Sequence, residues 1–183
     1  MEIAEGVYGI RELLTPAECQ ALIEFTKAHG YGAAPITTAR GFEMRPDIRN
    51  NARVIVDDVE RAEALWQRSR DEIPGFCKGR QVVGLNERFR FYRYDPGERF
   101  APHRDGAFRR DNGETSLLTF LVYLNEGFEG GETVVEGLPV VPKTGMALIF
   151  EHPLIHEGAA VTRGRKYVLR TDVMYGRFGQ VRG

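Results

Sequence analysis

The chain has 183 residues, of which 42% are hydrophobic and 28% charged, so its composition is that of a globular protein rather than a disordered one. Its net charge of −1 provides no overall positive field to attract nucleic acid or anionic lipid. No apolar run is long enough to span a bilayer, and the N-terminus lacks the features of a signal peptide. We therefore expect one soluble, cytoplasmic domain over residues 1–183, with neither nucleic acid nor membrane as a partner.

Two helices are predicted in the N-terminal part of the chain. Thr15-Pro16-Ala17-Glu18 combines an N-cap residue, a proline suited to the first turn and a carboxylate three residues after the cap. These features predict a helix over residues 16–29. A short strand is expected at 53–56, after which Asp57-Asp58 is suited to cap a second helix that ends near Asp71.

Residues 31–52, which lie between these elements, contain glycines, arginines and threonines without a sustained apolar period. A connection of this length is long for a compact domain, and such loops often serve a function. We therefore expect a lid here. The side chains expected to reach over the site from this region are Arg40, Arg45, Arg49, Asn51 and Arg53.

Beyond Val82 the apolar runs are short, rich in β-branched and aromatic residues, and interrupted by Gly, Pro or Asn. The strands expected from them are residues 88–94, 99–102, 116–125, 132–135, 146–151, 155–158 and 166–175. Two helices followed by closely spaced strands favour a mainly β fold, in which a helical layer packs on a double-sheet sandwich or jelly roll. Residues 1–80 would supply the helices and the lid, and residues 81–178 the jelly-roll core.

A short motif indicates a metal site. His103-Arg104-Asp105 places an imidazole and a carboxylate two residues apart, so that at the end of a strand both point to the same side. One more histidine from a distant strand would complete a facial triad of two histidines and one carboxylate, which leaves open positions on ferrous iron. The candidate is His156. The chain has only two cysteines, which form no CxxC pair, so nitrogen and oxygen ligands are expected.

Two other histidines were weighed for this role. His152 lies four residues before His156 and is an alternative ligand, although Pro153 follows it. His29 stands at the end of the first predicted helix, where a positive charge interacts favourably with the helix dipole, and no further role is expected for it.

The residues around the proposed ligands resemble the iron(II)- and 2-oxoglutarate-dependent dioxygenases, specifically the prolyl-4-hydroxylase-like branch. The matching patterns are YxxGxxFxxHxD ending at Asp105, a YLN strand followed by GGET, and HxGxxVxxGxK from His156 to Lys166. They occur in order over about residues 86–175. The last pattern selects His156, rather than His152, as the distal ligand.

This resemblance implies a double-stranded β-helix that holds Fe(II) through His103, Asp105 and His156, with 2-oxoglutarate as cosubstrate. It also implies that Lys166 pairs with the distal carboxylate of 2-oxoglutarate, assisted by Tyr94. Thr119 and Tyr123 match positions that line the same pocket in relatives. The implied reaction is hydroxylation of an aliphatic C–H of a peptide, amino acid or small metabolite by dioxygen, with release of succinate and CO2 and with ascorbate as a reductant.

Basic residues gather near the proposed metal site. Seven arginines stand against three carboxylates in residues 88–110, which would attract small anions to the mouth of the site. Arg170 has the same strand parity as Lys166 and therefore faces the same way. Collagen-type relatives generally lack an arginine at this place. Arg170 is either a second anchor for 2-oxoglutarate or for an anionic substrate, or it forms a structural ion pair with Asp or Glu.

Three other functions remain open at the level of sequence. The first is a non-oxidative, cupin-like module that binds or senses a metal or ligand on the same β scaffold. The second is a metal-dependent isomerase or dioxygenase of the cupin type, which would generally contain more than four histidines. The third is an interaction domain without metal.

Overall fold

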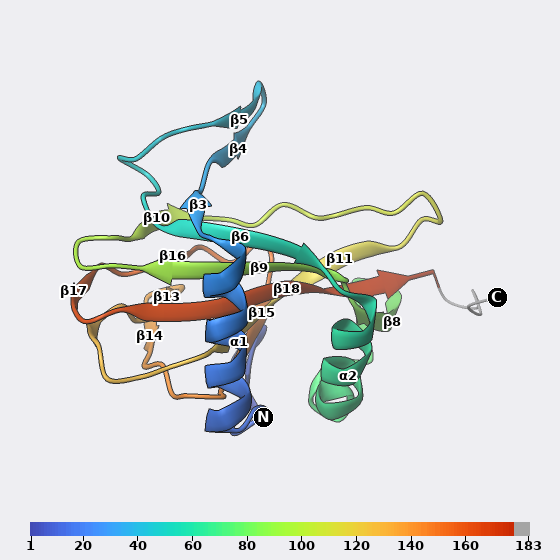
Figure 1. Ribbon diagram of the computed structural model, residues 1–183. Coiled ribbons are helices and arrows are strands. Elements are labelled where there is room, and N and C mark those ends of the chain that lie inside the picture. The colour runs from blue at the N-terminus through green and yellow to red at the C-terminus, as the bar shows by residue number, and fades with distance from the viewer. Residues whose placement is uncertain (178–183) are drawn as a thin grey trace.

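The computed structural model describes residues 1–177, and most of its regular structure is β-strand (Figure 1). The largest sheet of this part has ten strands, eight of them in the order β1-β2-β15-β11-β18-β9-β6-β3, while β8 pairs with β18 and β7 with β8. These strands are β1 (Glu2–Ala4), β2 (Val7–Ile10), β3 (Gly32–Ala33), β6 (Ala52–Asp57), β7 (Phe76–Cys77), β8 (Arg80–Leu85), β9 (Arg88–Tyr94), β11 (Thr115–Tyr123), β15 (Ala147–Glu151) and β18 (Lys166–Gly176).

A smaller, four-stranded sheet has the order β10-β16-β13-β14. Its strands are β10 (Phe100–His103), β13 (Thr133–Val135), β14 (Leu138–Val140) and β16 (His156–Gly158). Two further antiparallel pairs complete the described strands. They join β12 (Glu129–Gly130) to β17 (Val161–Arg163) and β4 (Ile36–Thr38) to β5 (Gly41–Glu43).

Alternation along the central strands divides the core into two layers. Phe120 of β11 and Leu169 of β18 point to the face of the large sheet that the helices cover. Leu121 follows Phe120 on β11, and Val168 precedes Leu169 on β18, so these two side chains point the other way. They pack with residues of the smaller sheet such as Val135. Strand geometry, with its period of two, thus produces two apolar layers from one sheet. The mainly β, double-stranded β-helix fold expected from the sequence is confirmed.

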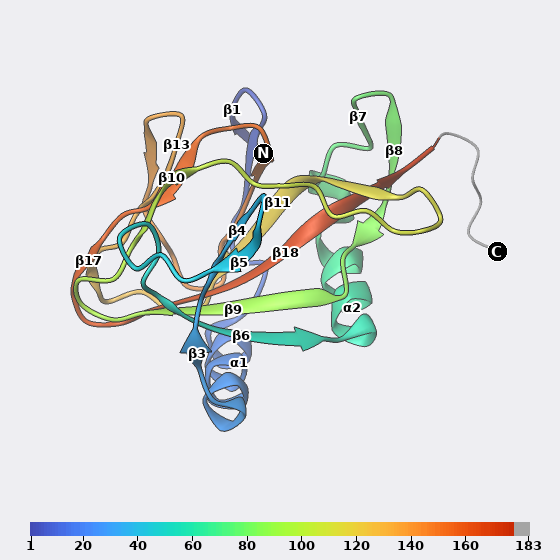
Figure 2. The ribbon, with the colours of Figure 1, turned by 90° about the horizontal axis from the view of Figure 1, so that it is seen from above.

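The helices α1 (Pro16–His29) and α2 (Val59–Ser69) lie against the large sheet, with a 3-10 turn at Arg70–Glu72 after α2 (Figures 1 and 2). The bounds predicted for α1 are confirmed, and the predicted end of α2 falls in the 3-10 turn. Asp58, one of the two expected caps, accepts a hydrogen bond from the backbone of Arg61. Within residues 1–177, no helix has both the length and the apolar character needed to cross a bilayer.

Several short strands were not predicted. The structure forms β1, β2, β7 and β8 where no strand was expected, and residues 31–52, expected to be a loop, contain β3 and the β4–β5 hairpin. Strands of two to four residues are too short to display a clear period of two, and β1 buries none of its side chains. Strand β8 has six residues, so its length does not explain why it was missed. The first 80 residues therefore add strands to the large sheet as well as helices.

The N-terminus of α1 provides a test of local stability. The Glu18 amide donates to Thr15 Oγ1 at 3.2 Å, and the Thr15 amide donates to Glu18 Oε2 at 2.8 Å, which is a complete capping box. Thr15→Ala should lower the free energy of unfolding by about 1 kcal/mol, measured by urea denaturation. Thr37→Ala, at an exposed position of β4, is the control and should leave it unchanged. Equal effects of the two substitutions would contradict the assignment.

Candidate metal centre

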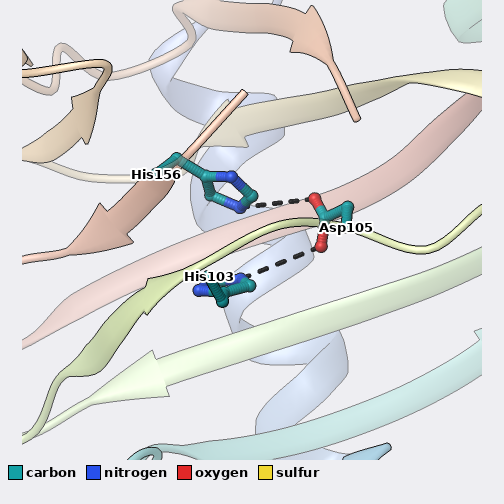
Figure 3. A group of neighbouring side chains, drawn as sticks. All are labelled: His103, Asp105 and His156. Carbon is teal, nitrogen blue, oxygen red and sulfur yellow. Dashed lines mark ion pairs between the residues drawn. The ribbon is translucent and has the colours of Figure 1, made fainter. Parts of the chain in front are cut away.

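Two neighbouring strands of the smaller sheet bring the proposed ligands together (Figure 3). His103 ends β10 and lies opposite His156, the first residue of β16, in the antiparallel register. Asp105 follows two residues after His103, and its amide donates to the carbonyl of His152 at 3.1 Å. The ligand atoms of His103, Asp105 and His156 all lie within 4.8 Å of one another. They form a group that we call the His-Asp-His group.

Backbone carbonyls orient both imidazoles. Nδ1 of His103 lies 2.8 Å from the carbonyl oxygen of Ala101, and Nδ1 of His156 lies 3.1 Å from that of Leu154. Since a carbonyl oxygen only accepts, both Nδ1 atoms must carry the proton. The Nε2 lone pairs then face Asp105, with His103 Nε2 at 3.8 Å from Oδ1 and His156 Nε2 at 3.3 Å from Oδ2. This arrangement is typical of histidine metal ligands.

The protonation states also suit a divalent metal. Burial lowers the pKa of His103 to about 4, so its imidazole is neutral at physiological pH. Burial alone would raise the pKa of Asp105, but the guanidinium of Arg170 and a hydrogen bond from Thr119 Oγ1, at 2.5 Å, hold it well below its usual range. Imidazole nitrogen and a carboxylate without thiolate fit iron(II) and similar divalent ions. The residues present therefore fit the implied metal.

The other two histidines have different neighbours. Ser116 Oγ and Thr119 Oγ1 lie 2.9 and 3.0 Å from the two ring nitrogens of His152, so this ring is placed behind Thr119. His29 Nδ1 lies 2.8 Å from the carbonyl oxygen of Phe25 at the end of α1. Of the described histidines, only His103 and His156 belong to the His-Asp-His group.

A buried lysine lies at the other end of the inner cavity. Lys166 is 2% exposed, and its Nζ donates to the carbonyl of Gly131 at 2.6 Å. The rings of Tyr94 and Tyr123 lie 5.2 and 5.6 Å from this nitrogen. Nζ makes no ion pair with any described carboxylate, and burial lowers its pKa to about 7. A buried ammonium of this kind is stabilised when an anion enters the cavity.

The Gly130-Gly131 turn makes the contact with Lys166 possible. Both residues have a positive φ, 70° and 71°, and a Cβ on Gly130 would lie 2.4 Å from the carbonyl oxygen of Ala160. Only glycine adopts this backbone so close to a neighbouring strand without strain. The glycines are therefore needed for close packing against the neighbouring strand, in addition to forming the turn expected from the sequence.

The His-Asp-His group separates two cavities. Lys166, Tyr94 and Thr119 line the inner cavity, while the β4–β5 hairpin borders the outer one, which has a volume of about 880 Å³. Residues common to both cavities are Tyr92, Phe100, His103, Asp105 and Arg170. A metal bound by the His-Asp-His group would therefore border both cavities.

Only part of the expected lid reaches the outer cavity. Arg49 and Arg53 line it, whereas Arg40 and Arg45 do not, and Arg45 pairs with Asp47. Asn51 is buried and accepts a hydrogen bond from Arg49 Nε. The β4–β5 hairpin projects from the body of the fold in Figure 1, and its residues Ile36, Thr37 and Phe42 line the outer cavity. Closure of a lid remains a prediction.

Arg170 forms ion pairs with aspartates, which was one of the two alternatives that the sequence allowed for it. Its Nη2 lies 3.0 Å from Asp105 Oδ1 and 3.4 Å from Asp172 Oδ1. Of the seven arginines in residues 88–110, those that line the outer cavity are Arg88, Arg90 and Arg104. Arg88 and Arg90 pair with aspartates. The basic mouth of the site is therefore partly neutralised.

Sequence reasoning missed some residues of the site. Tyr92 lines both cavities, and its parity with Tyr94 on β9 could have shown that the two rings share a face. Tyr123 OH donates to Thr133 Oγ1 at 2.7 Å, a partner that no motif indicates. Phe100 stacks on His103 with ring centroids 3.5 Å apart.

Comparisons with known proteins indicate the family to which this chain is similar. The family model described as the 2OG-Fe(II) oxygenase superfamily matches residues 89–171. Prolyl 4-hydroxylase 1 of Arabidopsis thaliana is 25% identical over 186 residues, which cover 86% of this chain and 65% of that protein. This chain thus spans slightly less than two thirds of that relative.

Two solved structures share the fold. A prolyl-4-hydroxylase of Pseudomonas putida has a TM-score of 0.70 at 22% identity, covering 92% of both chains. A prolyl hydroxylase of Trichoplax adhaerens, solved in complex with a peptide fragment of the hypoxia inducible factor oxygen degradation domain, has a TM-score of 0.68 at 16% identity, covering 92% of this chain and 83% of that one.

In protein that holds no metal or ligand, Lys166→Met should raise the free energy of unfolding by roughly 1–4 kcal/mol at pH 6, because it removes an unpaired buried charge. Above pH 7 folded Lys166 loses its proton, whereas the unfolded chain keeps it up to about 10.5. The unfolded state then binds more protons, so wild-type stability rises with pH and the advantage of the variant shrinks. Urea denaturation at pH 6 and pH 9 measures this. Exposed Lys143→Met is the control, and an advantage that does not vary with pH would contradict the prediction.

Proposed function

We propose that this chain is a member of the 2OG-Fe(II) oxygenase superfamily in its prolyl 4-hydroxylase-like branch, to which it is similar, and that it is an Fe(II)- and 2-oxoglutarate-dependent dioxygenase that hydroxylates an aliphatic C–H. The observation that carries the proposal is the His-Asp-His group beside a buried lysine without a carboxylate partner among the described residues. Peptides, amino acids and small metabolites are all candidate substrates.

His103, Asp105 and His156 would hold the iron through Nε2 atoms and a carboxylate oxygen. When bound, Fe(II) supplies the oxidation chemistry, in which dioxygen decarboxylates 2-oxoglutarate to succinate and CO2 and hydroxylates the substrate. Three protein ligands leave coordination positions for the cosubstrate and dioxygen. A closed four-ligand site would not do so.

The inner cavity is suited to 2-oxoglutarate. Its distal carboxylate requires a charge-assisted partner once it leaves water, and Lys166 supplies a cation held by the Gly131 carbonyl. Tyr94 lies opposite Lys166 in the register of β9 and β18, and its ring centre lies 5.2 Å from Nζ. Thr119 contacts Asp105 rather than Lys166, so we assign it to orienting the metal ligand. Tyr123 supports Lys166 through its ring.

The outer cavity would receive the primary substrate. The stacked ring of Phe100 covers one face of His103, and the ring of Phe150 lies 4.5 Å from that of His156, so apolar groups limit the access of water to both imidazoles. Water exclusion matters because it strengthens the interactions of charged groups in the site. Ascorbate is included as an external reductant, and no described residue is assigned to it.

The first experiment measures turnover. Protein prepared without oxygen, loaded with Fe(II) and supplied with ascorbate should convert 2-oxoglutarate to succinate when oxygen is admitted. His103→Ala or His156→Ala should reduce succinate formation at least about a hundredfold, because each removes one metal ligand. His29→Ala is the matched histidine control and should retain full turnover. Binding of 2-oxoglutarate without succinate would instead support a non-oxidative binding module.

The second experiment measures the affinity for 2-oxoglutarate against pH by calorimetry, with Mn(II) in place of Fe(II) and without oxygen. Because the anion requires charged Lys166, whose pKa in the free protein is about 7, the affinity should fall by up to about tenfold per pH unit above pH 7. Lys166→Arg keeps its charge and should remove this slope. The same slope in both proteins would overturn the assignment of Lys166.

A further inference from the structure

Three buried hydrogen-bonding groups cluster beside the outer cavity. Among the described residues, only five buried side-chain polar atoms have no hydrogen-bond partner. Three of these five belong to residues that line the outer cavity: Nη2 of Arg49, the hydroxyl of Tyr92 and Nε of Arg170. We call them the three-donor group. The Tyr92 hydroxyl lies close to the guanidinium groups of Arg49 and Arg170, so two buried cations meet at this oxygen. Neutralising buried cations requires acceptor atoms with negative charge, which indicates an anionic ligand.

Arg49 is built into the fold as a rigid cation. It is 5% exposed, and its guanidinium carbon lies 4.5 Å from the ring centre of Tyr92 and 4.4 Å from that of Phe100. Nε donates to Asn51 Oδ1 at 2.8 Å, a neutral acceptor, and Arg49 forms no ion pair with a described carboxylate. A guanidinium held between two rings presents its free edge in a fixed direction. Planar recognition of a carboxylate or phosphate uses this geometry.

The surrounding charges are mostly positive. The outer cavity is lined by six arginines against two aspartates: Arg49, Arg53, Arg88, Arg90, Arg104 and Arg170 against Asp105 and Asp172. Arg53 is half-buried and has no side-chain partner among the described residues, and its pKa is lowered first by burial and then by the charges of Arg49 and Arg90. Burial raises the pKa of Tyr92, but Arg170, Arg49 and Arg90 together lower it to about 8.

We propose that the primary substrate carries an anionic group, a carboxylate or a phosphate, which binds to Arg49 and Tyr92 in the outer cavity. The proposal rests on the proposed function, because it assumes that the outer cavity receives the substrate. It differs from the site for 2-oxoglutarate, whose distal carboxylate is assigned to Lys166 at the far end of the inner cavity. Arg49 is a buried cation without a carboxylate partner among the described residues, which favours an anion over a neutral group.

The geometry also limits where oxidation occurs on the substrate. Arg170, the third donor, lies 3.0 Å from the metal-ligand candidate Asp105. An anion that contacts the three-donor group is therefore next to the His-Asp-His group. The C–H that reacts should lie within a few bonds of the anionic group. The cavity volume of about 880 Å³ is within the range of sites for small molecules.

The test uses the full chain with Mn(II) and saturating 2-oxoglutarate, so that the inner cavity is filled. Titrations with inorganic phosphate and with acetate, followed by calorimetry, measure anion binding and show which of the two anion types is preferred. Arg49→Gln and Tyr92→Phe should each weaken the preferred anion by about tenfold or more, because each removes a donor. Arg40→Gln removes an arginine that does not line the cavity and is the charge-matched control for Arg49→Gln.

Tyr92→Phe separates binding from folding. It removes only the hydroxyl and keeps the ring on which Arg49 stacks, so the variant should still unfold cooperatively in thermal denaturation while its anion affinity falls. The affinity for 2-oxoglutarate, measured first, should be unchanged in Arg49→Gln and Arg40→Gln, because neither arginine lines the inner cavity. If wild-type protein binds neither anion, or if Arg49→Gln and Tyr92→Phe bind it as tightly as wild type, the proposal is overturned.

A loss of 2-oxoglutarate affinity in Arg49→Gln would also overturn it, since the three-donor group would then serve the cosubstrate. Failure of the proposed function gives a different result. In that case wild-type protein forms no succinate from 2-oxoglutarate, whether or not it binds it, and phosphate or acetate titrated into the Mn(II) protein still reports on the three-donor group. The two failures are therefore distinguishable.

Discussion

The antiparallel pairing of β10 with β16 is the constraint on which the site depends. It places His103 opposite His156, although the two residues are far apart in the sequence, and the short reach to Asp105 completes the group. The carbonyls of the same strands and of the loop before β16 hold both rings through Nδ1. The backbone thus decides which ring nitrogens face the centre, and a shift of one residue in the register would turn one imidazole to the other face of the sheet.

A second constraint is the long central strand β18, which connects the two cavities. Lys166 and Arg170 stand four residues apart on the same face, so their Cα atoms are separated by about 13 Å. Lys166 faces the inner cavity, and Arg170 lies at the His-Asp-His group. One strand therefore carries a cation on each side of the proposed metal. Two anions would be recognised separately, the cosubstrate at the inner end and the substrate at the outer end.

These cations have a cost in the protein without ligands. Lys166 buries an ammonium that has no carboxylate partner among the described residues. Arg49 buries a guanidinium that pairs only with the side-chain amide of Asn51. Both reduce stability unless anions neutralise them. Ligands that bind the folded state alone stabilise it, so the cavities should gain order and stability when they fill. The same buried cations that lower the stability of the ligand-free protein give it affinity for anions.

The sequence by itself determined α1, most of the strands after residue 86 and the identity of the proposed ligands, because caps, alternation and the HxD and HxGxxVxxGxK spacings are local patterns. It did not reveal β1, β2 or the β4–β5 hairpin, which are too short to show a period. Only the tertiary structure decided that Arg170 pairs with Asp105, that Arg49 stacks on Tyr92, and that Arg40 stays outside the cavity. Those contacts depend on strand register and on the path of the chain after α1, which involve residues distant in sequence and leave no local signal.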